Sequence, residues 1–366
     1  MIAGLSRSRV LGFALLAIFL MIFPFLHSWP GIGQLISEFR TFNATMFAVW
    51  LLVVLSMNLL TGYSGQISLG HAAVVLVGAY TAAVLFDQFG VPLALAVPIA
   101  GLFTGVVGGV IIGVPAVRLT GPYLAIATFS LIITMPQILK LNGLDNWTNG
   151  PLGIRIREVQ PPGFLEGFLD QGQWLYYVVM VTAVVMTVCA WALTQSRVGR
   201  AFVALRESEV AATAMGINVP LHKALAFGIS SFYAGIAGGL FFMVRAFVAP
   251  ESLGFLDSIL FLVAIVIGGL ATILGSIFGA LFLTFQSELI SNLANVIPQA
   301  EDLRGVIYGS LLIVVMIFFP RGLAGFVRGL PGWSPTLGGP HSGVVAALAR
   351  LIRPGHGTDS GAGRSD

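Results

Sequence analysis

The chain has 366 residues, of which 57% are hydrophobic and 9% are charged, and its formal net charge is +3. Together with a mean hydropathy of +0.95, this composition excludes an ordinary soluble protein and is typical of a polytopic membrane protein. The apolar runs are long and lack strand-like alternation, which argues against an outer-membrane barrel and leaves an all-α fold.

The spacing of the charged residues predicts about ten transmembrane helices. A charge near the bilayer centre is costly, and about 20 apolar residues cross the hydrocarbon core, so a long charge-free stretch holds at least one span. The stretches are, in chain order, Val10–Phe25, Thr41–Phe86 with two spans, 88–117, 119–139, Gln171–Ser196, Ala224–Val244, Ser258–Ser287 and Gly305–Pro320. If its glycines divide Ser258–Ser287, that stretch holds two short spans; otherwise the count is nine.

The distribution of the positive charges favours ten spans over nine. With Arg7 and Arg9 inside, ten alternating spans place 12 of the 18 Lys and Arg residues on the cytoplasmic side, whereas nine would put the basic tail outside. The predicted organisation is a cytoplasmic N-terminus (1–9), a transmembrane domain (10–328) with an external loop at about 141–173 and a cytoplasmic loop at about 195–223, and a disordered cytoplasmic tail (329–366). The first apolar run is followed by no cleavage site and is expected to be retained.

A glycine-rich polar segment separates the second span from the third. Gly62, Gly65 and Gly70 loosen the helix, and polar side chains come close to membrane depth at Asn58, Thr61, Ser64, Gln66, Ser68 and His71. In lipid, the backbone groups freed by such a break must be satisfied, so we expect the segment to be buried in protein or to face a wet cavity. An ordinary cytoplasmic turn between two helices is the alternative.

Further along the chain, glycines at four-residue spacing predict close helix packing. The fourth span carries Gly101, Gly105, Gly109 and Gly113, and small residues on one helix face let another backbone approach. A second interrupted segment, Gly268–Ser276, is weakly similar to the first. Paired interruptions can indicate an internal repeat that flanks a substrate path.

A charged island, Arg197–Lys223, lies between long apolar runs. Good helix formers from Gly199 to Ala214 predict one short helix along the membrane surface, and Gly216 followed by Pro220 is a fitting stop. The pattern alone is explained by an interfacial loop helix with snorkelling arginines.

Signatures of enzymatic chemistry are missing from the sequence. It contains no Gly-x-x-x-x-Gly-Lys-Ser/Thr loop for ATP, no His or Cys pair at metal spacing and no basic-aromatic pattern for nucleic acid. We therefore expect no catalytic residue, no metal and no nucleic-acid partner. The single cysteine, Cys189, can form no internal disulfide and is expected to be packed as a small hydrophobic side chain. The predicted spans also lack a carboxylate near mid-membrane, which argues modestly against a proton- or sodium-coupled carrier.

Three motifs occur in a specific order. They are Met57–Ala72, which reads Met-Asn-Leu-Leu-Thr-Gly-Tyr-Ser-Gly-Gln-Ile-Ser-Leu-Gly-His-Ala, then Gly-Pro-x-Gly-Ile at Gly150–Ile154, and Arg197–Asn218 in the island. In this order they closely resemble the branched-chain amino-acid ABC transporter permease family, of the M type. The resemblance spans roughly Leu51 to Leu323.

The resemblance implies the transmembrane subunit of an ATP-driven importer in the cytoplasmic (inner) membrane of a prokaryote. Its implied partners are a second permease subunit, two cytoplasmic ABC ATPases, a periplasmic or lipid-anchored solute-binding protein and the membrane lipid. ATP and Mg would bind to the partner ATPase, and this chain would hold no cofactor. Transport would proceed by alternating access, with the helix bundles rocking around a polar path.

The family's functional regions map onto three groups of residues. Coupling to the ATPase is expected of Arg200, Arg206, Glu207, Glu209, Ala211, Ala212, Met215 and Gly216. The translocation path is expected at Asn58, Gly62, Tyr63, Ser64, Gln66, Ser68 and His71. The binding-protein contact or outer gate is expected at Trp147, Asn149, Gly150, Pro151 and Gly153. The island reads Glu-x-Ala-Ala, so its spacing departs from the Glu-Ala-Ala loop of such permeases.

Two alternatives stay open at this point. A urea or short-amide permease of the same superfamily shares the architecture, and its selectivity rests largely with the binding protein. A standalone channel or secondary carrier would make the island merely a solvated connector.

Overall fold

The structure is a computed structural model, and it describes residues 38–119, 121–156, 161, 170–296, 309–310, 313 and 322–328. These residues are mostly helical, as the composition predicts. Their only strands, β1 (Ile154–Arg155) and β2 (Phe247–Val248), form one antiparallel pair. The N-terminus with the first predicted span, almost all of Gly305–Pro320 and the tail lie outside the described residues.

Within the described part of the chain, five helical stretches are long and apolar enough to cross a membrane, by length and composition. They are α2 (Glu38–Met57) continued by the π-helical turn η2 (Asn58–Tyr63); α4 (Leu93–Val107) continued by η3 (Gly108–Ile112) and α5 (Gly113–Ala116); α6 (Pro122–Leu139); α8 (Gln171–Gln195); and α11 (Val219–Arg245). Three shorter apolar helices are α3 (His71–Asp87), α12 (Phe255–Gly268) and the first part of α13 (Ile273–Val296). The remaining elements are α7 (Asp145–Thr148), η4 (Gly150–Leu152), α9 (Arg197–Glu207), α10 (Glu209–Ala214) and α15 (Gly322–Arg328).

The five long and three shorter helices occupy eight of the ten predicted spans. The glycines in Ser258–Ser287 do divide it, since α12 ends at Gly268 and α13 begins at Ile273. The predicted division of this stretch into two helices is therefore confirmed. The total of ten stays a prediction, because the spans at Val10–Phe25 and Gly305–Pro320 are not covered by the described residues.

Helix α11 forms the centre of the bundle and packs against α2, α3 and α4. Glycines bring these helices close together. Gly105 and Gly109 of the fourth span lie against α11 at Phe232 and Gly228. The close helix packing predicted from the four-residue glycine spacing is therefore confirmed. A helix face without side chains lets the α11 backbone approach.

The outward face of α8 is apolar. Val181, Val184, Val185 and Val188 on this helix are exposed, as expected of a surface that meets lipid. Cys189 is exposed on the same helix, so the expectation that it is packed inside the protein is wrong. The physical reason is that an apolar run in a membrane helix can face lipid as well as a protein core, and the sequence does not distinguish the two.

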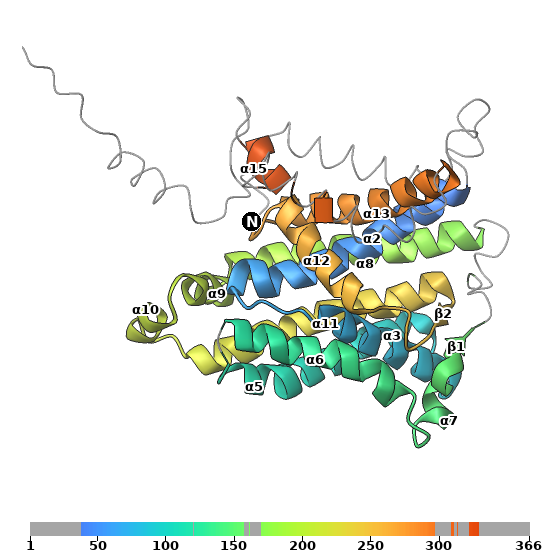
Figure 1. Ribbon diagram of the computed structural model, residues 1–366, viewed down its shortest axis with the longest axis horizontal. Coiled ribbons are helices and arrows are strands. Elements are labelled where there is room, and N and C mark those ends of the chain that lie inside the picture. The colour runs from blue at the N-terminus through green and yellow to red at the C-terminus, as the bar shows by residue number, and fades with distance from the viewer. Residues whose placement is uncertain are drawn as a thin grey trace, which may run out of the picture.

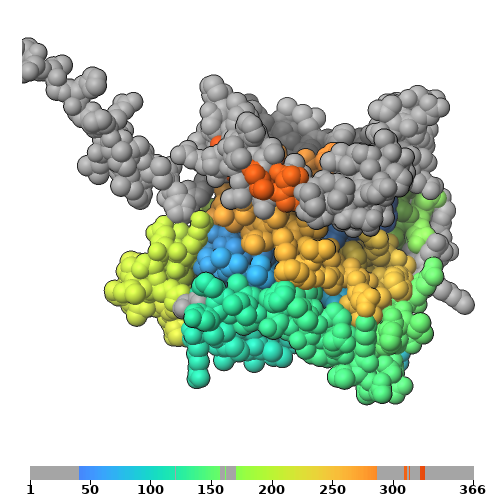
Figure 2. Space-filling view, in the orientation of Figure 1, coloured from blue at the N-terminus to red at the C-terminus, as the bar shows by residue number. Residues whose placement is uncertain are grey.

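The two ends of the bundle differ in what they carry (Figure 1). Helices α9 and α10 stand at one end, beyond the ends of α8 and α11, while α7, β1 and β2 lie at the opposite end. The space-filling view shows the yellow-green residues of α9 and α10 as a projection from the body of the molecule (Figure 2). The predicted cytoplasmic island and the predicted external loop therefore lie at opposite ends.

Candidate functional site

The glycine-rich segment after α2 is buried in the protein. The α-helix gives way to η2 at Asn58, and regular structure resumes only at His71. The side chains of Asn58, Ser64, Gln66, Ser68 and His71 are all buried, and so are Gly62 and Tyr63. This confirms that the broken helix is buried in protein, although the segment also forms the connection between α2 and α3.

Several freed backbone groups in this segment are satisfied locally. Ser64 Oγ donates to Leu60 O at 2.6 Å, Thr61 Oγ1 donates to Gln66 O at 3.0 Å, and Gln66 N–H donates to Leu60 O at 3.2 Å. Gln66 Nε2 donates to Ser64 Oγ at 3.1 Å. In the part of the chain that the structure describes, Gln66 Oε1 is buried without a hydrogen-bond partner. The segment therefore offers one free acceptor.

The two interrupted segments lie against each other through Asn58. Its Oδ1 accepts from Ala271 N–H at 2.9 Å, and its Nδ2 donates to Thr272 O at 2.8 Å and to Ser276 Oγ at 2.9 Å. Asn58 is completely buried, and a Cβ at Gly62 would clash with its side chain. One amide thus satisfies backbone groups left free at the break between α12 and α13. The weak sequence similarity of the two segments gave no indication of this contact.

A second set of polar contacts joins four helices near the same segment. Ser56 Oγ donates to Val53 O at 2.6 Å and lies 2.7 Å from His71 Nε2. This distance is that of a hydrogen bond between the hydroxyl and the imidazole, which joins α2 to α3. Ser230 of α11 donates to Ser56 O, and Ser258 of α12 accepts from Ala72 N–H. Sequence reasoning missed Ser230 and Ser258, whose only signal is that a hydroxyl in an apolar helix needs a partner.

The charged island forms two helices. We expected one helix from Gly199 to Ala214, and this is wrong, because the chain turns extended at Ser208 (φ −164°, ψ 117°). Ser208 Oγ accepts from Ala211 N–H at 3.2 Å, as an N-cap for α10. Ser208 followed by Glu209 in the first turn is a sequence signal for the start of a second helix.

The predicted stop at Gly216 is confirmed. Its φ is +80°, Gly216 N–H donates to Thr213 O, and Ile217 N–H donates to Ala212 O. These two bonds are the pair expected of a Schellman motif, which favours glycine at this position. Gly216 therefore ends α10 by its backbone conformation.

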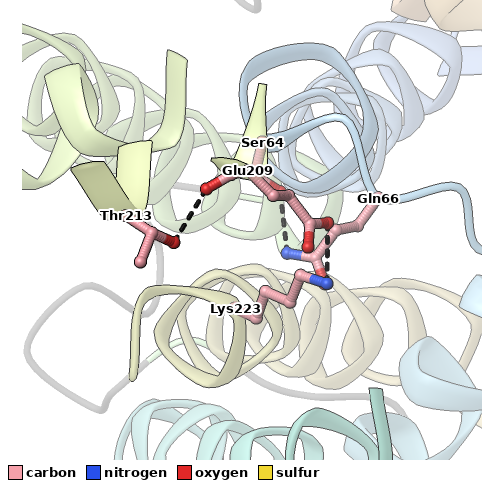
Figure 3. Close-up of polar contacts among 5 residues, drawn as sticks. All are labelled: Ser64, Gln66, Glu209, Thr213 and Lys223. Atoms are coloured by element: carbon pink, nitrogen blue, oxygen red, sulfur yellow. Dashed lines mark hydrogen bonds and ion pairs between the residues drawn. The ribbon is translucent and has the colours of Figure 1, made fainter. Parts of the chain in front are cut away.

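The charged residues of the island have partners within the chain. Arg206 Nη1 donates to Gly62 O at 2.7 Å, and Lys223 Nζ lies 2.7 Å from Glu209 Oε1 (Figure 3). Arg200 Nη1 donates to Gln195 O at 2.9 Å. Lys223 is buried, although the sequence places it with the charged residues of the cytoplasmic loop and not among the expected site residues.

The outward side of α10 is apolar. Val210 is 82% exposed and Met215 is 68% exposed, and Ala211 is exposed beside them. Ala212, by contrast, is fully buried, so its side chain faces this chain. Of the residues expected to couple to a partner, the apolar ones on the outward side are thus available for contact.

The opposite end presents the predicted outer-gate residues on a tight turn. Asn149, Gly150 and Gly153 all have positive φ, and Asn149 Nδ2 donates to Gly153 O at 3.1 Å. A Cβ at Gly153 would lie 2.2 Å from Val248 O of β2, so only glycine lets the turn pack there. Trp147 is partly exposed and packs on Phe89 with ring centroids 5.6 Å apart. Pro151 is exposed on the same turn.

An ion pair fixes this end of the molecule. Lys140, after α6, pairs with Glu251, which follows β2. The hydrogen bond and the positive charge of Lys140 hold the pKa of the Glu251 carboxyl below its ordinary value. The ion pair thereby ties the segment after β2 to the end of α6.

For metal binding, a search of the described residues finds no group of three or more His, Cys, Asp or Glu side chains that could hold an ion.

The comparisons with known proteins agree in one family. The model of the family described as branched-chain amino acid transport system / permease component matches residues 40–316. The high-affinity branched-chain amino acid transport system permease protein LivM of Salmonella typhimurium is 31% identical over 324 residues, which cover 82% of this chain and 73% of that protein. LivM of Escherichia coli is 30% identical over the same shares. LivH of Escherichia coli is 24% identical and covers 78% of this chain and 94% of that protein. No solved structure matches the chain.

Proposed function

The chain belongs to the branched-chain amino acid transport permease family, and from that premise we propose that it is the permease subunit of an ABC importer for leucine, isoleucine and valine. The observation that carries the proposal is the match over residues 40–316, which includes the bundle, both interruptions and the island. The chain is a multi-pass membrane protein, and we place it in the cytoplasmic membrane of a prokaryote because the relatives are bacterial.

The proposed assembly contains a second permease subunit. LivM and LivH are both named as permease proteins of a high-affinity branched-chain amino acid transport system, and both are similar to this chain. The chain is more similar to LivM, which favours the M position in a pair of related permeases. Two ABC ATPases and an external solute-binding protein complete the proposed importer, with ATP and Mg bound on the ATPases.

We place the ATPase contact on the outward side of α10. Exposed apolar side chains at the end of a projecting helix are the type of group that fills a pocket in a partner protein. The binding protein is placed at the opposite end, on the turn that carries Trp147. We propose transport by alternating access, with the glycine-rich segment, which lies against α9, moved from the end that carries the ATPase contact.

The proposed function is tested by reconstitution. We expect the complete complex in proteoliposomes, with its binding protein, to take up labelled leucine, isoleucine and valine only when ATP is present. Labelled urea and acetamide serve as controls for the related superfamily members. Uptake of leucine without any ATPase, or uptake of urea in place of leucine, would overturn the proposal.

The contact on α10 is expected to break when it is made acidic. Val210→Asp combined with Met215→Asp would bury two unpaired charges, and we expect the ATPase to bind about a hundredfold more weakly or worse. The measurement is co-purification of the ATPase with the permease. Leu152→Asp is the matched control, because Leu152 is 80% exposed at the opposite end. If the double variant retains the ATPase at the wild-type ratio, the contact lies elsewhere.

A further inference from the structure

The end of α9 is seated directly on the glycine-rich segment. Arg206 Nη1 donates to the carbonyl of Gly62, which lies in η2. A Cβ at Gly65 would lie 3.0 to 3.2 Å from the Cγ, Cα and Cβ atoms of Arg206, and Gly65 has φ +74°. The absence of a side chain at Gly65 therefore lets the island approach the break in the transmembrane helix.

A second connection joins α10 to α11. Glu209 is the first residue of α10, and its carboxylate pairs with Lys223 Nζ at 2.7 Å. The Lys223 side chain is only 4% exposed, whereas that of Glu209 is 44% exposed. A buried ammonium needs an opposite charge, so the pair holds α10 in place beside α11. Figure 3 shows Glu209 and Lys223 meeting from these two helices.

The acceptor of Arg206 belongs to the turn that also carries Asn58. Gly62 and Asn58 are both in η2, and Asn58 binds Ala271, Thr272 and Ser276 at the break between α12 and α13. Hydrogen bonds thus connect the island to η2 at Gly62 and connect η2 to the second interruption at Asn58. These contacts connect segments that are 144 to 218 residues apart in sequence.

We propose that Arg206 and the Glu209–Lys223 pair are positioning residues that transmit movement of the island to the bundle. Arg206 acts on the first interruption and, through η2 and Asn58, on the second, while the ion pair acts on α11. The inference rests on the proposed function, because a partner must move the island. Arg206 and Glu209, expected from the sequence to dock on the ATPase, act within the chain, and the ATPase binds the apolar side of α10. Movement of α10 then pulls on α11 through the ion pair, and movement of α9 pulls on η2 through the Gly62 carbonyl.

The test compares Arg206→Gln with Arg200→Gln in the reconstituted complex. Both arginines are exposed on α9, but Arg200 bonds only to the carbonyl of Gln195, the last residue of α8. Because Arg206 is exposed, Arg206→Gln is expected to fold. We expect it to keep the ATPase and to hydrolyse ATP, while the leucine carried per ATP falls about tenfold. Arg206→Lys, which retains a donor, is expected to fall less, and Arg200→Gln to match the wild type.

Two outcomes would overturn the proposed linkage, by which we mean the transmission of movement from the island to the helix bundle. One is normal transport per ATP in both Arg206→Gln and Glu209→Gln, and the other is loss of ATPase binding in Arg206→Gln, which would make Arg206 a docking contact.

A measurement on the permease alone separates this inference from the proposed function. We expect amide hydrogen exchange at 58–66 and 269–276 to rise in Arg206→Gln and not in Arg200→Gln. Unchanged exchange in both segments would refute the linkage even if the wild-type complex carries no substrate. Absence of ATP-dependent uptake by the wild type, together with raised exchange in Arg206→Gln, would refute the proposed function and keep the linkage.

Discussion

Replacing Asn58 with leucine is expected to leave little folded permease in a detergent extract. Leucine has the same branching and number of heavy atoms as asparagine but a larger volume, so the change removes the hydrogen bonds and adds crowding in a buried site. Ala271 N–H, Thr272 C=O and Ser276 Oγ would each lose their contact to the amide in a buried site. Thr272 C=O keeps its hydrogen bond from Ser276 N–H, so two groups are left unsatisfied. Each unsatisfied buried group costs about 1–3 kcal/mol, so the expected loss is about 2–6 kcal/mol. A typical free energy of unfolding is only about 5–15 kcal/mol.

The measurement is size-exclusion chromatography with a thermal melt of the solubilised protein. Thr81→Val is the matched control, because Thr81 donates only to Val77 O in its own helix and its removal leaves no group of another element unpaired. Thr81→Val is expected to melt within a few degrees of the wild type. If Asn58→Leu did the same, the contact between the two interruptions would not be needed to hold the bundle together.

Features that depend on the chain's own charge and glycine pattern could be predicted from the sequence. Charge-free stretches locate the apolar helices because an unpaired charge in lipid is costly and long spans avoid it. The division of α12 from α13 and the end of α10 at Gly216 follow from local backbone preference at glycine. These signals need no knowledge of a partner.

Contacts between distant segments could not be predicted in the same way. Asn58 and Ala271 are 213 residues apart, and a single asparagine carries no information about which backbone group it will bind. The position of Lys223 inside a helix could not be predicted either. Charge counting starts a span after it, at Ala224, yet α11 begins at Val219, capped by Asn218, and includes Lys223. Its burial is possible only because Glu209 from another helix neutralises it.

The expected coupling residues could be divided into those that contact this chain and those exposed to a partner only once the fold was known. Pattern alone groups Arg206, Glu209, Ala211 and Met215 as one docking set. In the structure, the two charged residues point to partners within the chain, while Ala211 and Met215 are exposed. Which residues of a short helix face outward depends on how α9 and α10 sit on the bundle, and this depends on the break at Ser208.

Replacing Gly238 with alanine is expected to separate α3 from α11 and to cost about 3 kcal/mol, at the upper end for overpacking a core. The added Cβ would lie 2.0 Å from Val75 O and 2.8 Å from Ala79 N, which are backbone atoms that cannot rotate away. Gly228→Ala is the matched control on α11, since its Cβ would come no closer than 3.3 Å to Gly105 O. Both changes gain the same helix propensity, so the difference between their melting temperatures reports the contact. We expect Gly238→Ala to melt well below Gly228→Ala, and equal melting temperatures would mean that α3 and α11 can move apart at little cost.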